Sequence, residues 1–190
     1  MPVAERKPTK REPAQAKHTP RLESRKRPRV ARTARPAAPR QRANSFGKLW
    51  SFAGIFDFDP IARVHMIKRG LPATVPGEMA VRMGMSKERL YLTIGLPRAT
   101  VERKAREATP LSAEEGSRVL GLGHLVGQVQ RMVEQSGQPG AFDAAAWVAQ
   151  WLDRPVAALG GLRPAELMDT GEGQRIVANL LSRAQSGAYS

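Results

Sequence analysis

Apolar residues recur every three or four positions along most of the chain after residue 58, which is the spacing of one face of an α-helix. No segment keeps the alternation of apolar and polar residues that marks a strand. Capping residues, prolines and glycines divide the pattern into separate helices, so the sequence predicts an all-α fold. The helices are expected over 60–69, 73–83, 86–94, 98–107, from 112 to about 134, from 144 onward, over 164–169 and from 171 until Gly187.

The longest predicted helix begins at a capping box, in which the side chains of Ser112 and Glu115 each satisfy the other's free backbone N–H. Gly121, Gly123 and Gly127 fall inside this helix, and each costs about 1 kcal/mol relative to Ala, so another element must approach closely there. Apolar residues spaced alternately by three and four form a two-heptad seam, which packs either on a second copy, giving a homodimer, or in the chain's own core. The seam consists of Val119, Leu122, Val126, Val129 and Val133.

The stretch FGKLWSFAGIFDF, residues 46–58, holds four of the five phenylalanines and one of the three tryptophans. Its alternation of apolar and polar residues is imperfect, so we expect an irregular segment that packs as a strap over the core. The alternative is an apolar patch that binds a partner.

Residues 86–106 have the order of a helix-turn-helix, with the turn at Gly95. Val101 and Ala105 face inward in the second helix, which leaves its polar residues free to enter a DNA major groove, where Arg binds guanine and Thr contacts a thymine methyl group. Tyr91 departs from this motif, because close packing of the two helices favours a small side chain four residues before the turn glycine. An ordinary helical hairpin with a basic face is the alternative. The predicted DNA-binding residues are Arg98, Thr100, Arg103, Lys104 and Arg106.

Positive charge is concentrated at the start of the chain. Residues 1–43 hold 14 basic and three acidic side chains, so they carry +11 of the net charge of +14, and they contain seven prolines. Such a segment has little to bury and cannot offset the entropy of ordering, about 1–2 kcal/mol per residue. We therefore expect a disordered basic arm over 1–45, which acts either as a solubilising tail or as an arm that binds phosphate backbones.

The sequence lacks the residues that several kinds of chemistry require. It has no Cys, its three histidines lie in no metal-ligand spacing, and no Ser-His-Asp order is present. The glycines of GLGHLVG, 121–127, do not have the spacing of a dinucleotide-binding loop. We expect no catalytic residue, no metal site and no cofactor. No apolar run has the length of a membrane span or of a signal-peptide core, so we expect a cytoplasmic protein with no membrane partner.

The stretch WLDRPVAALGGLRPAELMDTGEGQRIVANLLSRAQSGAYS, residues 151–190, carries many fixed features: a Trp-Leu pair followed by Pro155, Gly160-Gly161, Pro164, Asp169-Thr170 and a closing Gly-x-Tyr-Ser. Together these features resemble the toxin-binding domain of the Xre/MbcA/ParS family of bacterial antitoxins. Residues 59–132 are similar to the Xre-like helical domain of that family in their helix pattern and turn. We therefore expect an arm over 1–45, an Xre-like helix-turn-helix domain over 46–135 and a small helical toxin-binding domain over 140–190.

The resemblance implies an antitoxin of a type II toxin–antitoxin system that binds a RES-domain toxin, an enzyme that consumes NAD by degrading it or by transferring its ADP-ribose, and blocks its active site. It also implies a homodimer that represses its own operon through operator DNA. The alternative is a stand-alone helix-turn-helix protein whose C-terminal unit only supports dimerisation.

The residues expected to bind the toxin gather at the Gly-Gly turn, at the start of the last helix and at its end. Arg163 departs from the family pattern, which has a small polar capping residue before Pro164, and the basic arm lies outside that pattern. Gly187 is expected to free a tip whose aromatic ring, hydroxyl and carboxylate reach the mouth of the toxin's NAD site. The expected toxin-binding residues are Gly160, Gly161, Arg163, Asp169, Thr170, Glu172, Arg175, Arg183, Tyr189 and Ser190.

Overall fold

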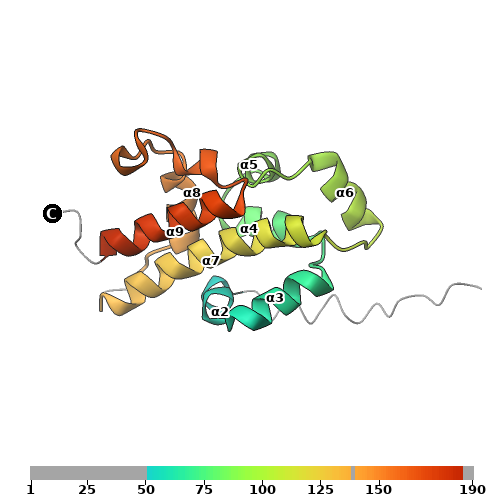
Figure 1. Ribbon diagram of the computed structural model, residues 1–190, viewed down its shortest axis with the longest axis horizontal. Helices are drawn as coiled ribbons and strands as arrows, with labels where there is room; N and C mark the ends of the chain where they lie inside the picture. The colour runs from blue at the N-terminus through green and yellow to red at the C-terminus, as the bar shows by residue number, and fades with distance from the viewer. Residues whose placement is uncertain (1–50, 138–139, 186–190) are drawn as a thin grey trace, which may run out of the picture. The chain divides into compact units, whose positions relative to one another are not determined.

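The computed structural model describes residues 51–137 and 140–185, and this part of the chain contains helices and no strand, as predicted (Figure 1). The arm expected over 1–45, Gly187 and the tip residues Tyr189 and Ser190 lie outside the described residues. The helices are α2 (Phe52–Asp57), α3 (Pro60–Arg69), α4 (Val75–Arg82), α5 (Lys87–Thr93), α6 (Arg98–Arg106), α7 (Ala113–Gln135), α8 (Ala144–Trp151), the 3-10 helices η2 (Ala157–Leu159) and η3 (Pro164–Leu167), and α9 (Gly171–Gln185).

The predicted capping residues start the helices. Ser112 and Glu115 form the capping box of α7 in both directions, with hydrogen bonds of 3.2 and 2.7 Å. Each cap satisfies a backbone N–H that the first helical turn leaves without a partner. Side chains that accept a backbone N–H in the same way are those of Asp59 for α3, Ser86 for α5, Asp143 for α8 and Thr170 for α9.

Residues 52–57 form a regular helix, so the irregular segment expected over 46–58 is wrong for this part. The Ser51 hydroxyl accepts the N–H of Gly54 and starts α2, whose Phe52 and Ile55 stand three residues apart and are both buried. The expectation that this stretch packs over the core is confirmed, because α2 lies against α7. Residues 46–50 lie outside the described part.

The long helix α7 is the element on which the others pack, and it contacts α2, α3, α4, α8 and α9. A Cβ added at Gly127 would stand 2.1 Å from the carbonyl oxygen of Phe52, so α2 reaches this position only because α7 carries a glycine there. A Cβ at Gly121 would likewise collide with Gln174 of α9. The close approach expected at the glycines is confirmed, and the approaching helices belong to the same chain.

The apolar seam of α7 is internal. Val119, Leu122 and Val126 have no exposed surface, and Val129 is 4% exposed. Val119, Leu122, Val126 and Val129 belong to the chain's own core, so of the two alternatives for the seam these four residues follow the second, whereas Val133 is half-buried outside that core. Any dimer of this chain has to use another surface.

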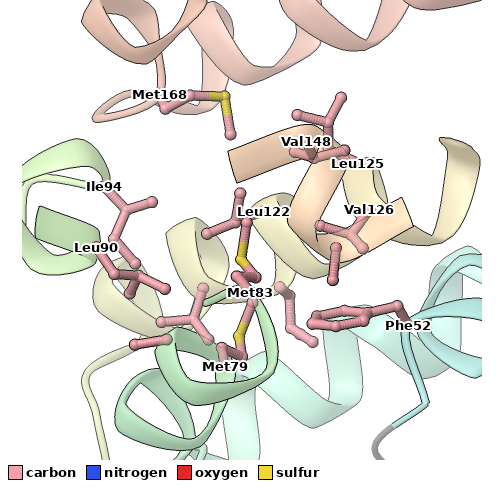
Figure 2. Packing of buried hydrophobic residues seen from close by; sticks show 14 of the residues in the cluster. Phe52, Met79, Met83, Leu90, Ile94, Leu122, Leu125, Val126, Val148 and Met168 are labelled. Carbon is pink, nitrogen blue, oxygen red and sulfur yellow. The ribbon is translucent and has the colours of Figure 1, made fainter. Parts of the chain in front are cut away.

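One core joins the two regions that the sequence predicted as separate domains. Figure 2 shows Phe52 of α2 and Met83, which follows α4, near Leu122 of α7, and Val148 of α8 and Met168 near the same helix. The described residues, 51–137 and 140–185, belong to a single compact unit. The helices before residue 138 and after residue 139 therefore depend on each other for burial.

A partly buried ion pair ties α6 to the start of α7. The Lys104 Nζ lies 2.5 Å from the Glu115 Oε2, and the two side chains are 15% and 10% exposed. Burial raises the pKa of Glu115, but the Lys104 ammonium and the backbone N–H of Ser112 lower it by more, so this pKa stays below its ordinary value of 4.5. The ion pair therefore stabilises the fold above that pH and is lost as the pH falls through the lowered pKa.

The variant Glu115→Gln should lower the free energy of unfolding at pH 7 by about 2–3 kcal/mol, between the values typical of exposed and buried pairs, because Lys104 loses its counter-charge. The difference from the wild type should shrink at acidic pH, as the pH falls through the lowered pKa of Glu115 and this carboxylate becomes protonated. Urea unfolding at pH 7 and at acidic pH measures this difference in the free energy of unfolding. The neighbouring Glu114→Gln is the control, since Glu114 is 84% exposed and should cost about 0.5 kcal/mol or less. Equal losses in the two variants would contradict this account.

Candidate functional sites

The most closely packed pair of helices joined by a short turn is α4–α5, one step earlier than the predicted α5–α6 pair. Gly84 connects α4 to α5 with a φ of +64°, a left-handed conformation that suits glycine. Ala80, four residues before this glycine, is fully buried, whereas Tyr91 holds the corresponding place before Gly95. The small side chain that a helix-turn-helix requires is therefore present in α4–α5.

The exposed side of α5 is chemically mixed. Leu92 is 83% exposed, although it is apolar, and it lies opposite the buried Leu90 and Ile94. Glu88 on the same side pairs with Arg98 at 2.8 Å. Lys87, at the start of the helix, is exposed and has no ion pair with the described part of the chain. Such a face offers one cation and one apolar contact to a groove.

The five DNA-binding residues predicted on α6 do not form one free cationic face. Arg98 is exposed but bridges Glu88 and Glu102, and the carboxylate and charge of Glu102 raise its pKa further. Lys104 is only 15% exposed and pairs with Glu115, so it offers little charged surface to DNA. The other three are Thr100, which is half-buried, Arg103, which is exposed and paired with Glu107 at 2.7 Å, and Arg106, which is exposed without an ion pair to the described residues.

The predicted Gly-Gly turn of the C-terminal region is a closed loop. Gly160 and Gly161 have φ values of +68° and +86°, and the N–H of Gly161 donates to the carbonyl of Val156 at 3.1 Å. The Glu166 carboxylate accepts from both the backbone N–H and the Nε of Arg163, at 3.2 and 2.9 Å. Glu166 thus accepts the free backbone N–H at the start of η3, where Arg163 stands in place of a small polar capping residue.

The last helix buries one side on α7 and exposes the other. Val177 and Leu181 face the core, and the Gln174 amide donates to the carbonyls of Arg118 and Met168 at 3.0 and 2.9 Å. Ile176 is 42% exposed on the outer side. The pair Glu172–Arg175, one turn before, is also exposed, and the Arg175 guanidinium lowers the pKa of Glu172.

The predicted toxin-binding residues within the described part are all exposed, but they fall into two groups along the chain. One group is the turn at 160–163, and the other is the start of α9 with its preceding residues. Asp169 in the second group also joins the two halves of the molecule, because the Arg118 Nη1 donates to its carbonyl at 3.5 Å and to that of Gly95 at 2.7 Å. The second group consists of Asp169, Thr170, Glu172 and Arg175, and Arg183 lies farther along the helix.

Sequence reasoning missed the helix pair α4–α5 and the role of Asp153. The signal for the first was present, since Ala80 stands four residues before Gly84. No signal marked Asp153, which pairs with Arg89 of α5 across 64 residues of sequence. Among the described residues, no group of three or more acidic or histidine side chains is placed to hold a metal ion, and no helix is long and apolar enough to cross a membrane.

Comparison with known proteins matches both regions. Residues 62–123 match the antitoxin Xre-like helix-turn-helix domain, and residues 141–187 match the antitoxin Xre/MbcA/ParS C-terminal toxin-binding domain. The chain is 38% identical over 141 residues to the Prs ADP-ribosylating antitoxin of Sphingobium sp. (strain YBL2), an alignment that covers 74% of this chain and 89% of that protein. The chain therefore belongs to the Xre/MbcA/ParS family and is an antitoxin of a toxin–antitoxin system.

Proposed function

We propose that this antitoxin binds a RES-domain toxin through the outer side of α9 and the turn at 160–163, and thereby blocks the toxin's active site. The supporting observation is that α9 leaves Ile176 exposed beside the Glu172–Arg175 pair, within the segment that matches the toxin-binding domain. An exposed apolar side chain beside charged groups is typical of a protein interface, which has an apolar centre and a polar rim. The other side of α9 is already used by the core.

The variant Ile176→Asp should weaken binding of the toxin by about thirtyfold, the loss expected for an apolar residue near the centre of an interface. The measurement is the affinity of the purified chain for the product of the adjacent gene, which this proposal identifies as a RES-domain protein. Val64→Asp on α3 is the matched control, because Val64 is also 42% exposed. Equal affinities of the two variants would rule out α9 as the binding side.

We further propose that the residues after α9, which include Tyr189 and Ser190, enter the toxin's NAD site. These residues lie outside the described part of the chain, and the support is chemical. A pocket that accepts a dinucleotide offers surfaces for stacking and donors for phosphate oxygens, and a tyrosine ring with a neighbouring hydroxyl can occupy such groups. In this mechanism α9 and the turn at 160–163 supply the affinity and bring the residues after α9 to the active site, which these residues then block.

Truncation after Gly187 separates these two roles. The shortened chain should still copurify with the toxin, because α9 is intact, but its potency in suppressing NAD consumption should fall by about tenfold or more. NAD consumption by the toxin is measured against increasing amounts of each antitoxin. Undiminished potency of the shortened chain would show that the tip is dispensable.

We also propose that the antitoxin represses its own operon, with α5 in the major groove and α6 beside the phosphates. The supporting observation is the packed α4–α5 pair with Gly84 at its turn, which lies in the segment that matches the helix-turn-helix domain. Leu92 then contacts a thymine methyl group, and Lys87, Arg103 and Arg106 face phosphates. A homodimer on two half-sites remains part of this proposal, with its interface outside the α7 seam.

Leu92→Asp should abolish the preference for a duplex from the antitoxin's own promoter over a duplex of unrelated sequence, because a carboxylate replaces the apolar contact on the proposed reading side. Arg106→Gln should weaken binding to both duplexes and reduce the slope of log affinity against log salt by about 0.9. Val64→Asp should leave both affinities within about twofold. If Leu92→Asp keeps the preference while Arg98→Ala or Arg103→Ala loosens it, α6 is the reading helix, as the sequence had predicted.

A further inference from the structure

A residue of the C-terminal region, Asp153, pairs with the charged side chain of Arg89 on α5. The Arg89 guanidinium forms an ion pair with the Asp153 carboxylate, just after α8, and its Nη2 lies 3.5 Å from the carbonyl of Ala149. The two charged side chains are 46% and 42% exposed. Arg89 is therefore close to solvent but is directed toward the toxin-binding region.

Arg89 belongs to the side of α5 that the proposed function places against DNA. It precedes Leu92 by three residues, so the two side chains are neighbours on the helix surface. The buried side of the helix is made by Leu90 and Ile94. Released from Asp153, the long side chain of Arg89 has the reach to contact a phosphate at the edge of the groove.

The other end of α5 is fixed independently of this ion pair. The carbonyl of Gly95 accepts from Arg118 at 2.7 Å, and Leu90 and Ile94 are fully buried. Loss of the Asp153 charge therefore frees the side chain of Arg89 and leaves the helix in place.

We propose that Asp153 is a brake on DNA binding: it competes with DNA phosphate for Arg89 and so lowers the affinity of the antitoxin for DNA. This inference rests on the proposed DNA binding by α5. It places a regulator of the reading helix inside the segment that matches the toxin-binding domain, residues 141–187. A ligand or partner that draws Asp153 away from Arg89 raises DNA affinity by the same competition.

The expected size of the effect follows from the salt dependence of phosphate contacts. Each contact contributes a slope of about −0.9 to log affinity against log salt, which corresponds to about eightfold in affinity at 0.1 M salt. An ion pair exposed to this degree changes an equilibrium constant by at most about fivefold, and this factor limits how far Asp153 can lower the affinity for DNA. The contact is to the backbone and is independent of sequence.

The test compares Asp153→Asn with Glu172→Gln in the full-length antitoxin. Both variants remove one negative charge from an exposed ion pair in the C-terminal region, but the partner of Glu172 is Arg175 of α9 and not a residue of α5. The probes are a 30-base-pair duplex of arbitrary sequence and a duplex from the antitoxin's own promoter. Asp153→Asn should bind both duplexes about three- to fivefold more tightly at 0.1 M salt, with a slope steeper by up to about 0.9, and Glu172→Gln should change either affinity by less than about twofold.

A double variant assigns the gain to Arg89. Arg89→Gln should remove the gain in the Asp153→Asn background and should weaken binding by the wild type by only about two- to threefold, because Asp153 holds Arg89 there for most of the time. If the wild type binds DNA and Asp153→Asn binds no more tightly than Glu172→Gln, the brake is wrong and the proposed DNA binding stands. A gain that survives Arg89→Gln also overturns the brake. If neither the wild type nor Asp153→Asn binds either duplex, the brake and the proposed DNA binding fail together.

Discussion

The structure depends on how closely other helices approach α7. The backbone of Phe52 and the side chain of Gln174 occupy the positions that side chains at Gly127 and Gly121 would fill. These glycines cost helix propensity, about 1 kcal/mol each, and the close contacts with α2 and α9 compensate for it. Because α2 belongs to one predicted region and α9 to the other, the same helix joins both into one core.

This shared core determines which surfaces are left for partners. Leu92 on α5 and Ile176 on the outer side of α9 stay exposed after the core has formed, as do the apolar side chains of Ile61, Val64, Val81, Phe142 and Leu162. Polar contacts connect the C-terminal region with α5 and the turn after it. They include the Arg89–Asp153 ion pair and the hydrogen bonds of Arg118 to the carbonyls of Gly95 and Asp169. The proposed toxin-binding and DNA-binding surfaces are therefore connected by a few direct contacts. If binding of the toxin changes the affinity for DNA through them, binding of DNA changes the affinity for the toxin by the same factor.

The local features of the fold could be predicted from the sequence, because caps and turns depend on residues a few positions apart. Ser112 with Glu115, Asp143 and Thr170 all start helices where expected. The contacts that decide function are between residues far apart in the sequence. Whether the α7 seam faces a second copy or the core depends on where α8 and α9 pack, and the pairing of Lys104 depends on Glu115 of another helix. Helix α2 was missed because its six residues are too few for a clear period, although Ser51 caps it.

The central claim is that α9 and the neighbouring turn form the surface that binds the toxin. Hydrogen exchange of backbone amides in the free antitoxin and in its complex with the copurified toxin tests this claim without any substitution. The account predicts that the backbone amides at the start of α9, around Ile176, and those of residues 157–167 exchange more slowly in the complex. Exchange in α3 should be unchanged. Slower exchange confined to α2 and α3, with α9 exchanging as it does in the free chain, would contradict it.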